Sequence, residues 1–159
     1  MIGEREKRFM QMAVKLSEKG MSNGDGGPFG TIVVRGEEVV GEGWNQVLRH
    51  NDPTAHAEVV AIRAACKKLN TFQLHDCEIY TSCEPCPMCL GAIYWARPQR
   101  VYYANTKEDA AAIDFDDSFI YREIAVPHDE KKIPLIGMPT AEALTVFHAW
   151  KEKGDKTLY

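Results

Sequence analysis

The sequence lacks an excess of basic residues. Its 19 lysines and arginines are outnumbered by 23 aspartates and glutamates, giving a net charge of −4 and a pI near 5.7. Proteins that bind polynucleotides chiefly through phosphates usually carry a basic stripe. The charge balance therefore argues against a nucleic-acid partner and favours a small-molecule substrate.

Long apolar segments are also missing. Charged residues occupy Glu4 to Arg8, ahead of the first apolar stretch, and no run approaches the roughly 20 apolar residues of a membrane-spanning helix. We therefore expect a soluble, cytoplasmic protein with no membrane partner. A length of 159 residues with 45% hydrophobic content suits a single domain, residues 1–159, built on one core.

Cysteine is scarce, and three of the five lie close together at Cys83, Cys86 and Cys89. An odd number fits a reducing compartment better than a disulfide framework. The three could also begin an iron–sulfur run, but the bacterial pattern would place a fourth cysteine near Ile93, and none is there. We predict that Cys83 is a small buried side chain at a strand end and not a ligand.

The residues best suited to metal binding and catalysis lie in two fragments: His56-Ala57-Glu58 and Pro85-Cys86-Pro87-Met88-Cys89. One imidazole and two thiolates give three zinc ligands and leave one position open for water, whose pKa zinc lowers to about 7. We predict one Zn²⁺ per chain, held by His56, Cys86 and Cys89. Glu58 is the candidate proton carrier. A purely structural zinc site would need a fourth protein ligand and has no use for Glu58.

Both fragments are predicted to lie at helix starts. Residues two apart on a regular helix point about 200° away from each other, so His56 and Glu58 can face one metal only where the helix begins. Asp52 is a good N-cap and Pro53 a good first helical residue. The apolar spacing that follows predicts a helix ending near Asn70. Pro85 and Pro87 mark a turn into a second, apolar helix.

The remaining pattern alternates helices with strands. An amphipathic stripe ending at Gly20 predicts a first helix, and the glycine-rich residues 21–30 predict a loop. A helix is also expected from about Ala141 to Lys151. The predicted strands are Thr31–Arg35, Val39–Trp44, Glu78–Thr81 and Arg100–Ala104. This order predicts an α/β fold with helices on both faces of a sheet.

The two motifs together resemble the signature of zinc-dependent nucleobase deaminases. Further segments narrow the resemblance to the bacterial guanine deaminases of the cytidine-deaminase-like superfamily, over nearly the whole length. These segments are Gly26–Gly30, Asn51–Glu58, Thr81–Arg97, Phe115–Phe119 and the C-terminal Tyr159. The resemblance implies a three-layer α/β/α, cytidine deaminase-like fold with a mixed central sheet of about five strands.

The resemblance also implies an activity and its residues. Members of this family hydrolyse guanine to xanthine and ammonia, so a purine base is the implied substrate. Glu58 would shuttle protons and Asp117 would handle the leaving amino group. Asn45 would bind the purine and Phe29 would stack on it, at about 1–3 kcal/mol per stacked base.

Three more substrate contacts are expected at Ala57, Trp95 and Tyr159. In the family, the C-terminal segment crosses to the partner subunit and caps its active site. The resemblance therefore implies a homodimer in which residues 141–159 pack on or swap to a second subunit, with Tyr159 closing the pocket.

Simpler interpretations of these residues stay open on the sequence alone. Phe29 could fill the core, Asn45 could form a turn, and Asp117 could belong to a solvated acidic loop. Trp95 suits core packing as well as pocket lining. Two other substrate classes also remain: guanosine or another aminopurine or aminotriazine, and tRNA adenosine, although the last should require a basic surface.

Overall fold

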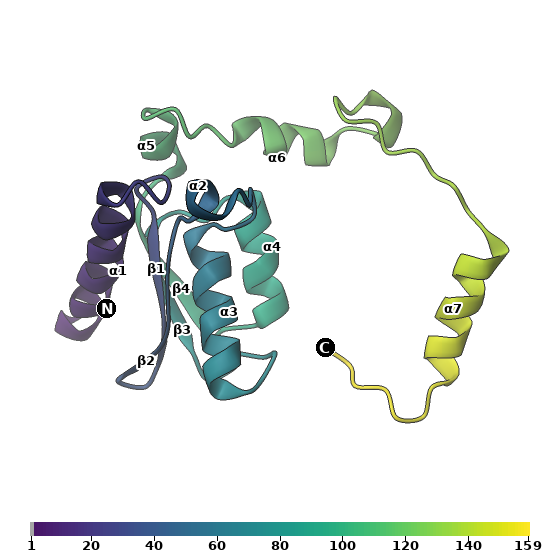
Figure 1. The fold of residues 1–159 in the computed structure, drawn as a ribbon, viewed down its shortest axis with the longest axis horizontal. Coiled ribbons are helices and arrows are strands. Elements are labelled where there is room, and N and C mark those ends of the chain that lie inside the picture. The colour runs from purple at the N-terminus through teal and green to yellow at the C-terminus, as the bar shows by residue number, and fades with distance from the viewer. Residues whose placement is uncertain (1) are drawn as a thin grey trace. The chain divides into compact units, whose positions relative to one another are not determined.

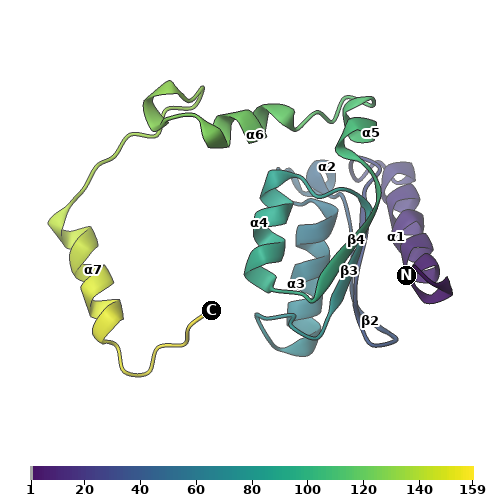
Figure 2. The same cartoon turned by 180° about the vertical axis from the view of Figure 1, so that it is seen from behind.

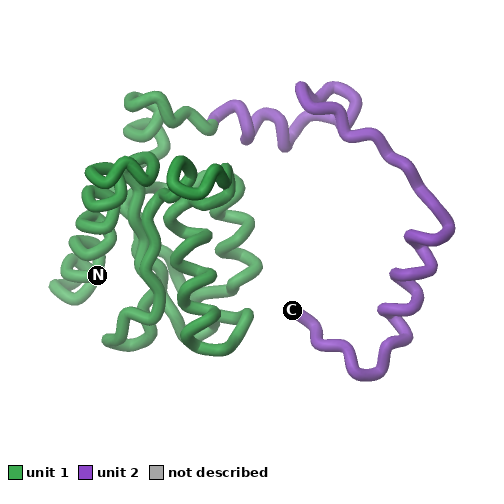
Figure 3. The backbone as a smooth tube through the Cα atoms, in the orientation of Figure 1, with its two compact units in different colours: residues 1–117 green, residues 118–159 purple. Residues whose placement is uncertain are grey.

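A computed structural model describes residues 2–159 (Figure 1). The chain forms two compact units, one ending at Asp117 and the other covering Ser118–Tyr159 (Figure 3). Each unit is described by itself below. Within the described residues, no helix is long and apolar enough to cross a membrane.

A mixed sheet forms the centre of the first unit. Its strands are β1 (Gly30–Arg35), β2 (Glu38–Trp44), β3 (Glu78–Cys83) and β4 (Arg100–Asn105). They lie in the order β2-β1-β3-β4. The β1/β2 and β1/β3 pairs are antiparallel, and β3/β4 is parallel. The four strands match the four ranges predicted from residue pattern, each to within two residues.

Helices cover both faces of this sheet, as Figures 1 and 2 show: α1 (Glu4–Ser22) on one face, α3 (Ala57–Leu69) and α4 (Pro87–Ala96) on the other. Side chains alternate along each strand, so Ile32 packs with α1 while Val33 packs with α3 and α4. The predicted three-layer α/β/α architecture is confirmed.

The number of strands differs from the expectation. About five were implied by the family resemblance, but the structure has four among residues 2–159. After β4 the chain turns into the short helix α5 (Lys107–Ala111), whose N-cap Thr106 accepts a hydrogen bond from the Asp109 amide at 3.2 Å. A capped helix at this point ends the strand pattern, so β4 is an edge of the sheet.

Two glycines in β2 bring α3 unusually close to the sheet. A Cβ on Gly43 would lie 2.3 Å from the Ala57 carbonyl oxygen, and one on Gly41 would lie 2.4 Å from the Ala61 carbonyl oxygen. Contacts this short are sterically impossible for any residue with a side chain. The glycines therefore fix how closely the first turn of α3 approaches the strand.

The predicted start of this helix was wrong by four residues. α3 begins at Ala57 with His56 as its N-cap, not at Pro53 with Asp52 as the cap. The Asp52 carboxylate instead accepts hydrogen bonds from the amide (2.8 Å) and hydroxyl (2.7 Å) of Thr54. Asp52 therefore stabilises a tight turn two residues on, a common alternative for aspartate.

The second unit consists of α6 (Ser118–Ala125), the 3₁₀ turn η1 (His128–Glu130) and α7 (Ala141–Glu152). None of these three elements contains a buried residue. The helix predicted from about Ala141 to Lys151 is confirmed as α7. The α6 helix was not predicted, and neither was α2 (Val47–His50) in the first unit.

Candidate active site

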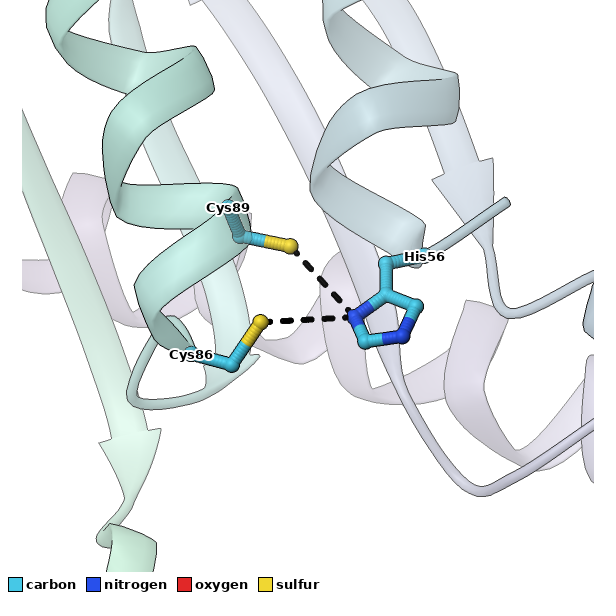
Figure 4. Close-up of side chains that lie close together, drawn as sticks. All are labelled: His56, Cys86 and Cys89. Atoms are coloured by element: carbon cyan, nitrogen blue, oxygen red, sulfur yellow. Dashed lines mark hydrogen bonds between the residues drawn. The ribbon is translucent and has the colours of Figure 1, made fainter. Parts of the chain in front are cut away.

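The three predicted zinc ligands converge from two helix starts. His56 is the N-cap of α3, Cys86 is the N-cap of α4, and Cys89 lies one turn into α4. Both N-cap residues have extended backbones, with ψ of 155° at His56 and 168° at Cys86. This explains how His56 and Glu58 serve one site although they are two residues apart. Figure 4 shows the three side chains pointing toward one another.

The spacing of the donor atoms fits a metal ion. The Sγ atoms of Cys86 and Cys89 each lie 3.5 Å from His56 Nδ1, and the three donors lie within 4.8 Å of one another. A tetrahedral zinc with ordinary bond lengths separates nitrogen and sulfur ligands by about 3.6 Å. The residues present therefore suit Zn²⁺, with Nδ1 as the histidine donor.

The surroundings favour a thiolate at Cys86. The Cys89 thiol donates a hydrogen bond to it and His56 lies beside it, and these interactions lower the pKa of Cys86 to about 4. Because the Cys89 thiol donates its proton in this hydrogen bond, the pKa of Cys89 is raised. The backbone amide of Cys89, in the first turn of α4, also donates to the Cys86 sulfur, as at other helix starts that stabilise thiolates. These interactions favour one thiolate in the pair, at Cys86.

Cys83 lies apart from this group. It ends β3, is buried, and directs its Sγ to the Thr106 carbonyl oxygen at 3.5 Å. Among the described residues, the group of His, Cys and acidic side chains able to hold a metal contains His56, Cys86 and Cys89. The prediction that Cys83 is a buried strand-end residue is confirmed.

Glu58 is the second residue of α3 and its side chain is almost fully buried, with 6% exposed. Burial is the main cause that raises the pKa of this carboxyl above its usual range. The interaction of the carboxyl with Cys89 opposes the rise. A buried carboxyl that holds or releases a proton beside a metal site suits acid–base chemistry.

Phe29 and Asn45 are brought together by the sheet. The backbone N–H of Asn45 donates a hydrogen bond to the Phe29 carbonyl oxygen at 3.0 Å. The side-chain Oδ1 of Asn45 accepts a hydrogen bond from the backbone N–H of Val47 at 3.2 Å. The Phe29 ring meets Phe115 edge to face, with centroids 4.9 Å apart. A Cβ on Gly27 would lie 2.7 Å from the Phe115 ring, so the glycine loop is what allows this aromatic pair.

Asp117 is half-buried and electrostatically coupled to the metal ligands. Desolvation raises the pKa of its carboxyl, and the negative charge of Cys86 adds to the rise. This interaction with Cys86 ties Asp117 to the same region as Glu58, which the sequence separation of the two residues does not reveal.

The other predicted contacts have different surroundings. The side chain of Ala57 is fully buried and its carbonyl approaches Gly43. Trp95 lies in the last turn of α4, at the opposite end from Cys86, and is 64% exposed. Tyr159 belongs to the second unit and is largely exposed. Their expected roles in substrate binding stay predictions.

Sequence comparison places this geometry in a family. Residues 3–105 match the cytidine and deoxycytidylate deaminase zinc-binding region. The chain belongs to this deaminase family. The match contains both ligand motifs and all four strands, so the zinc-dependent chemistry of the family applies to the site formed by His56, Cys86 and Cys89.

Individual relatives of the deaminase are also informative. It is 54% identical to the guanine deaminase of Bacillus subtilis over 151 residues, covering 95% of this chain and 97% of that one. The solved structure of the Bacillus subtilis guanine deaminase matches it with a TM-score of 0.94, 51% identity and 99% coverage of both chains. A tRNA-specific adenosine deaminase of Buchnera aphidicola is 36% identical over 69% of this chain and 72% of that one.

Sequence reasoning missed several residues of the deaminase site. Phe115 contacts the Phe29 ring. Thr81 donates a hydrogen bond to Glu58, and Thr31 donates one to Thr81. Threonine is common in strands, so the sequence pattern does not distinguish these two from ordinary sheet residues. The one available signal was that Thr81 shares a face with Ile79, where the pattern calls for an apolar side chain.

Proposed function

We propose that this deaminase hydrolyses guanine to xanthine and ammonia. The observation that carries the proposal is the 54% identity with the Bacillus subtilis guanine deaminase over 95% of the chain, together with a site that holds three zinc donors and a buried carboxyl. The nucleobase deaminases that read RNA are more distant relatives. The net charge of −4 also disfavours a polynucleotide substrate.

The reaction replaces the C2–NH₂ bond of guanine by a C2–O bond from water. When bound, zinc supplies a Lewis acid that lowers the pKa of water at the open position to about 7. In our proposal, Glu58 transfers one proton from the attacking water to a purine ring nitrogen, and then a second proton, from the new C2 hydroxyl, to the departing nitrogen, which leaves as ammonia. Burial of the Glu58 carboxyl, which favours its protonated form, supports the role of acid in the second half of the reaction.

Substrate recognition is proposed to come from Phe29, Asn45 and Asp117. Because the Asn45 Oδ1 accepts from Val47, its carboxamide NH₂ is the part left to donate to a purine acceptor. Asp117 would accept from the 2-amino group and the adjacent ring N1–H of guanine, a pair of neighbouring donors that cytosine, whose amino group flanks the acceptor N3, does not present. The edge-to-face contact with Phe115 holds the Phe29 ring in one orientation, which supports its use as a stacking surface.

Ala57, Trp95 and Tyr159 complete the proposed purine site. Ala57 begins α3, where backbone amides have no intrahelical partner, so its N–H is the group we expect to face the base. Tyr159 would close the pocket and limit the space for a ribose. Trp95 would line the pocket in the assembled enzyme.

We also infer that the enzyme is a homodimer whose C-terminal segment, residues 141–159, packs on or swaps to the partner. Large apolar side chains throughout the second unit are exposed in a single chain, including Ile136 at 82% and Phe147 at 74%. Leu90 and Tyr94 on α4 are exposed as well. Apolar surface of this extent is typical of a subunit interface.

We propose that this enzyme works in a reducing compartment. Cys66, Cys77 and Cys83 have no disulfide partner, and thiolate ligands survive best where thiols stay reduced. The cytoplasm satisfies that condition.

The decisive experiment measures ammonia released from guanine, guanosine, cytosine and adenine side by side. We expect turnover of guanine to exceed that of the other three. Preference for guanosine would support the aminopurine alternative and argue against a pocket closed to ribose. Release of ammonia from adenine or cytosine, with none from guanine, would contradict the proposal.

A further inference from the structure

Two threonines interrupt an otherwise apolar face of the sheet. Val33 and Ile79 lie on the face that packs against α3 and α4. Side chains two residues apart on a strand share a face, so Thr31 and Thr81 belong to it as well. The two are directly opposite each other in the antiparallel β1/β3 pair. Both are buried, at 0% and 1% exposure.

The two hydroxyls form a chain that ends at the proposed proton carrier. The Thr31 hydroxyl donates to Thr81 Oγ1 at 2.9 Å, and the Thr81 hydroxyl donates to Glu58 Oε1 at 3.3 Å. A hydroxyl has one proton to donate. Because Thr81 accepts from Thr31, its own proton is directed at the carboxylate.

The contact with Glu58 is suited to orienting the carboxylate. At 3.3 Å it is longer than the usual O–H···O separation of about 2.7–2.8 Å. A bond of this length restricts rotation of a buried carboxylate without holding it tightly. The Thr81 hydroxyl therefore acts on one oxygen of the carboxylate, Oε1, and through it on the orientation of the group.

We propose that Thr81 is a positioning residue for Glu58, and that Thr31 sets the direction of the Thr81 hydroxyl. The inference rests on the proposed deaminase function and adds to it a pair of buried strand residues that would act through Glu58. Misplacing a catalytic group by 1 Å can cost about 10²-fold in rate, so a partial loss of orientation should lower turnover measurably.

A packing role is the alternative. In that case the two threonines would only hydrogen-bond to each other, and replacing both by valine would cost about as much stability as replacing either one. This alternative predicts no specific effect of the threonines on Glu58. Valine has nearly the volume of threonine and fits a face that already carries Val33, so Thr81→Val removes the hydroxyl with little change in shape.

The test compares Thr81→Val with Thr81→Ser and with Thr31→Val as the matched control. Turnover is measured with whichever of guanine, guanosine, cytosine and adenine the wild-type enzyme deaminates fastest, so the choice of substrate does not enter the result. Zinc content and the melting temperature are recorded for every variant. A wild-type preference for a base other than guanine would count against the proposed function alone.

We expect Thr81→Val to lower kcat roughly tenfold while KM changes less than about twofold and zinc stays at one per chain. Thr81→Ser, which keeps the hydroxyl, should recover most of the lost kcat. Thr31→Val should lose less than Thr81→Val, because it leaves the donor to Glu58 in place. Wild-type kcat in Thr81→Val would overturn the proposal. A loss in Thr31→Val as large as in Thr81→Val, or loss of zinc in Thr81→Val without rescue by serine, would do the same.

Discussion

At the scale of single residues, three cysteines within seven positions have two different roles. Cys86 and Cys89 share a helix start with their sulfurs 3.5 Å from one imidazole nitrogen, whereas Cys83 ends a strand. Helix geometry makes this selection, since residues at an N-cap and one turn later lie on the same side. In the alternative pair, Cys83 ends β3 and Cys86 caps α4, so the two belong to different elements.

Metal content tests this choice of ligands. Purified wild-type protein should contain about one zinc per chain, because three donors leave one open position. Cys89→Ala should lose most of the metal, while Cys83→Ala should keep it. Both variants are assayed by elemental analysis after dialysis. Zinc retained in Cys89→Ala and lost in Cys83→Ala would mean that the ligand set is wrong.

Glu58 is tested by replacing its carboxylate with an amide of nearly the same shape. Glu58→Gln should keep zinc and the fold but lose turnover by roughly 10²–10⁴-fold, because an amide cannot accept and return a proton. Steady-state kinetics with guanine and metal analysis are measured on the same sample. A variant with more than about a tenth of wild-type kcat would remove Glu58 from the proton-transfer role.

At the scale of elements, the site depends on how closely α3 approaches β2. The first turn of α3 carries His56, Ala57 and Glu58, and Gly43 allows its backbone to contact the strand. The first turn of α3 therefore cannot move independently of the sheet. The same argument explains why the ligands are on helices and not on loops, since rigid elements hold a site more precisely.

Gly43→Ala should disturb that contact. The added Cβ would lie 2.3 Å from the Ala57 carbonyl oxygen, and overpacking of this kind costs about 1–3 kcal/mol in the free energy of unfolding. We also expect weaker zinc binding, because the α3 start must move. Glu42→Ala, at an exposed neighbouring position, is the control and should change stability by less than about 0.5 kcal/mol. Urea unfolding of both variants makes the comparison. Equal stability in the two would show that α3 can shift without cost.

At the scale of the whole molecule, the second unit has no buried residue in its helices. A single chain would expose much of its apolar surface to water, which soluble proteins rarely do. This is the physical reason for proposing a dimer, and the role of the tail in the partner's site stays a prediction.

Complementation between two inactive chains tests the swapped tail. Deletion of residues 156–159 and Glu58→Gln should each lower guanine turnover on their own. Coexpressed as a mixed dimer, they should recover activity, because one site would combine an intact Glu58 with the intact tail of the other chain. No recovery in isolated mixed dimers would place the tail on its own subunit. Full activity of the deletion variant alone would make the tail dispensable.

The stability of the molecule should fall in alkaline solution because of Cys77. Burial, aided by Asp76, raises the pKa of this thiol from 9.0 to about 11. The unfolded chain therefore ionises first, and the stability that the neutral thiol contributes is lost as pH rises from about 9 to about 11. Cys77→Ala should be less stable than wild type at pH 8, and the difference should shrink at pH 10.5. A difference that stays constant across this range would contradict the shift.

The sequence by itself determined the zinc donors, the four strands and the layered fold, because each is encoded by local spacing. Ligand identity follows from His56 and from the interval between Cys86 and Cys89, and strands follow from runs of β-branched residues. The fifth strand came from the family resemblance alone, and the structure does not contain it among residues 2–159. The error at Asp52 arose because one side chain can either cap a helix or close a turn, and local sequence does not choose between them.

Only the tertiary structure decided which distant residues meet. Thr31 and Thr81 are 50 positions apart, and Glu58 is 23 positions from Thr81. Strand register and the approach of α3 bring them into one hydrogen-bonded chain. Phe115, which follows α5, contacts Phe29 across 86 positions. Local patterns report the faces of elements, but contacts between elements depend on packing distances, which the glycines of β2 set only once the sheet and helix have formed.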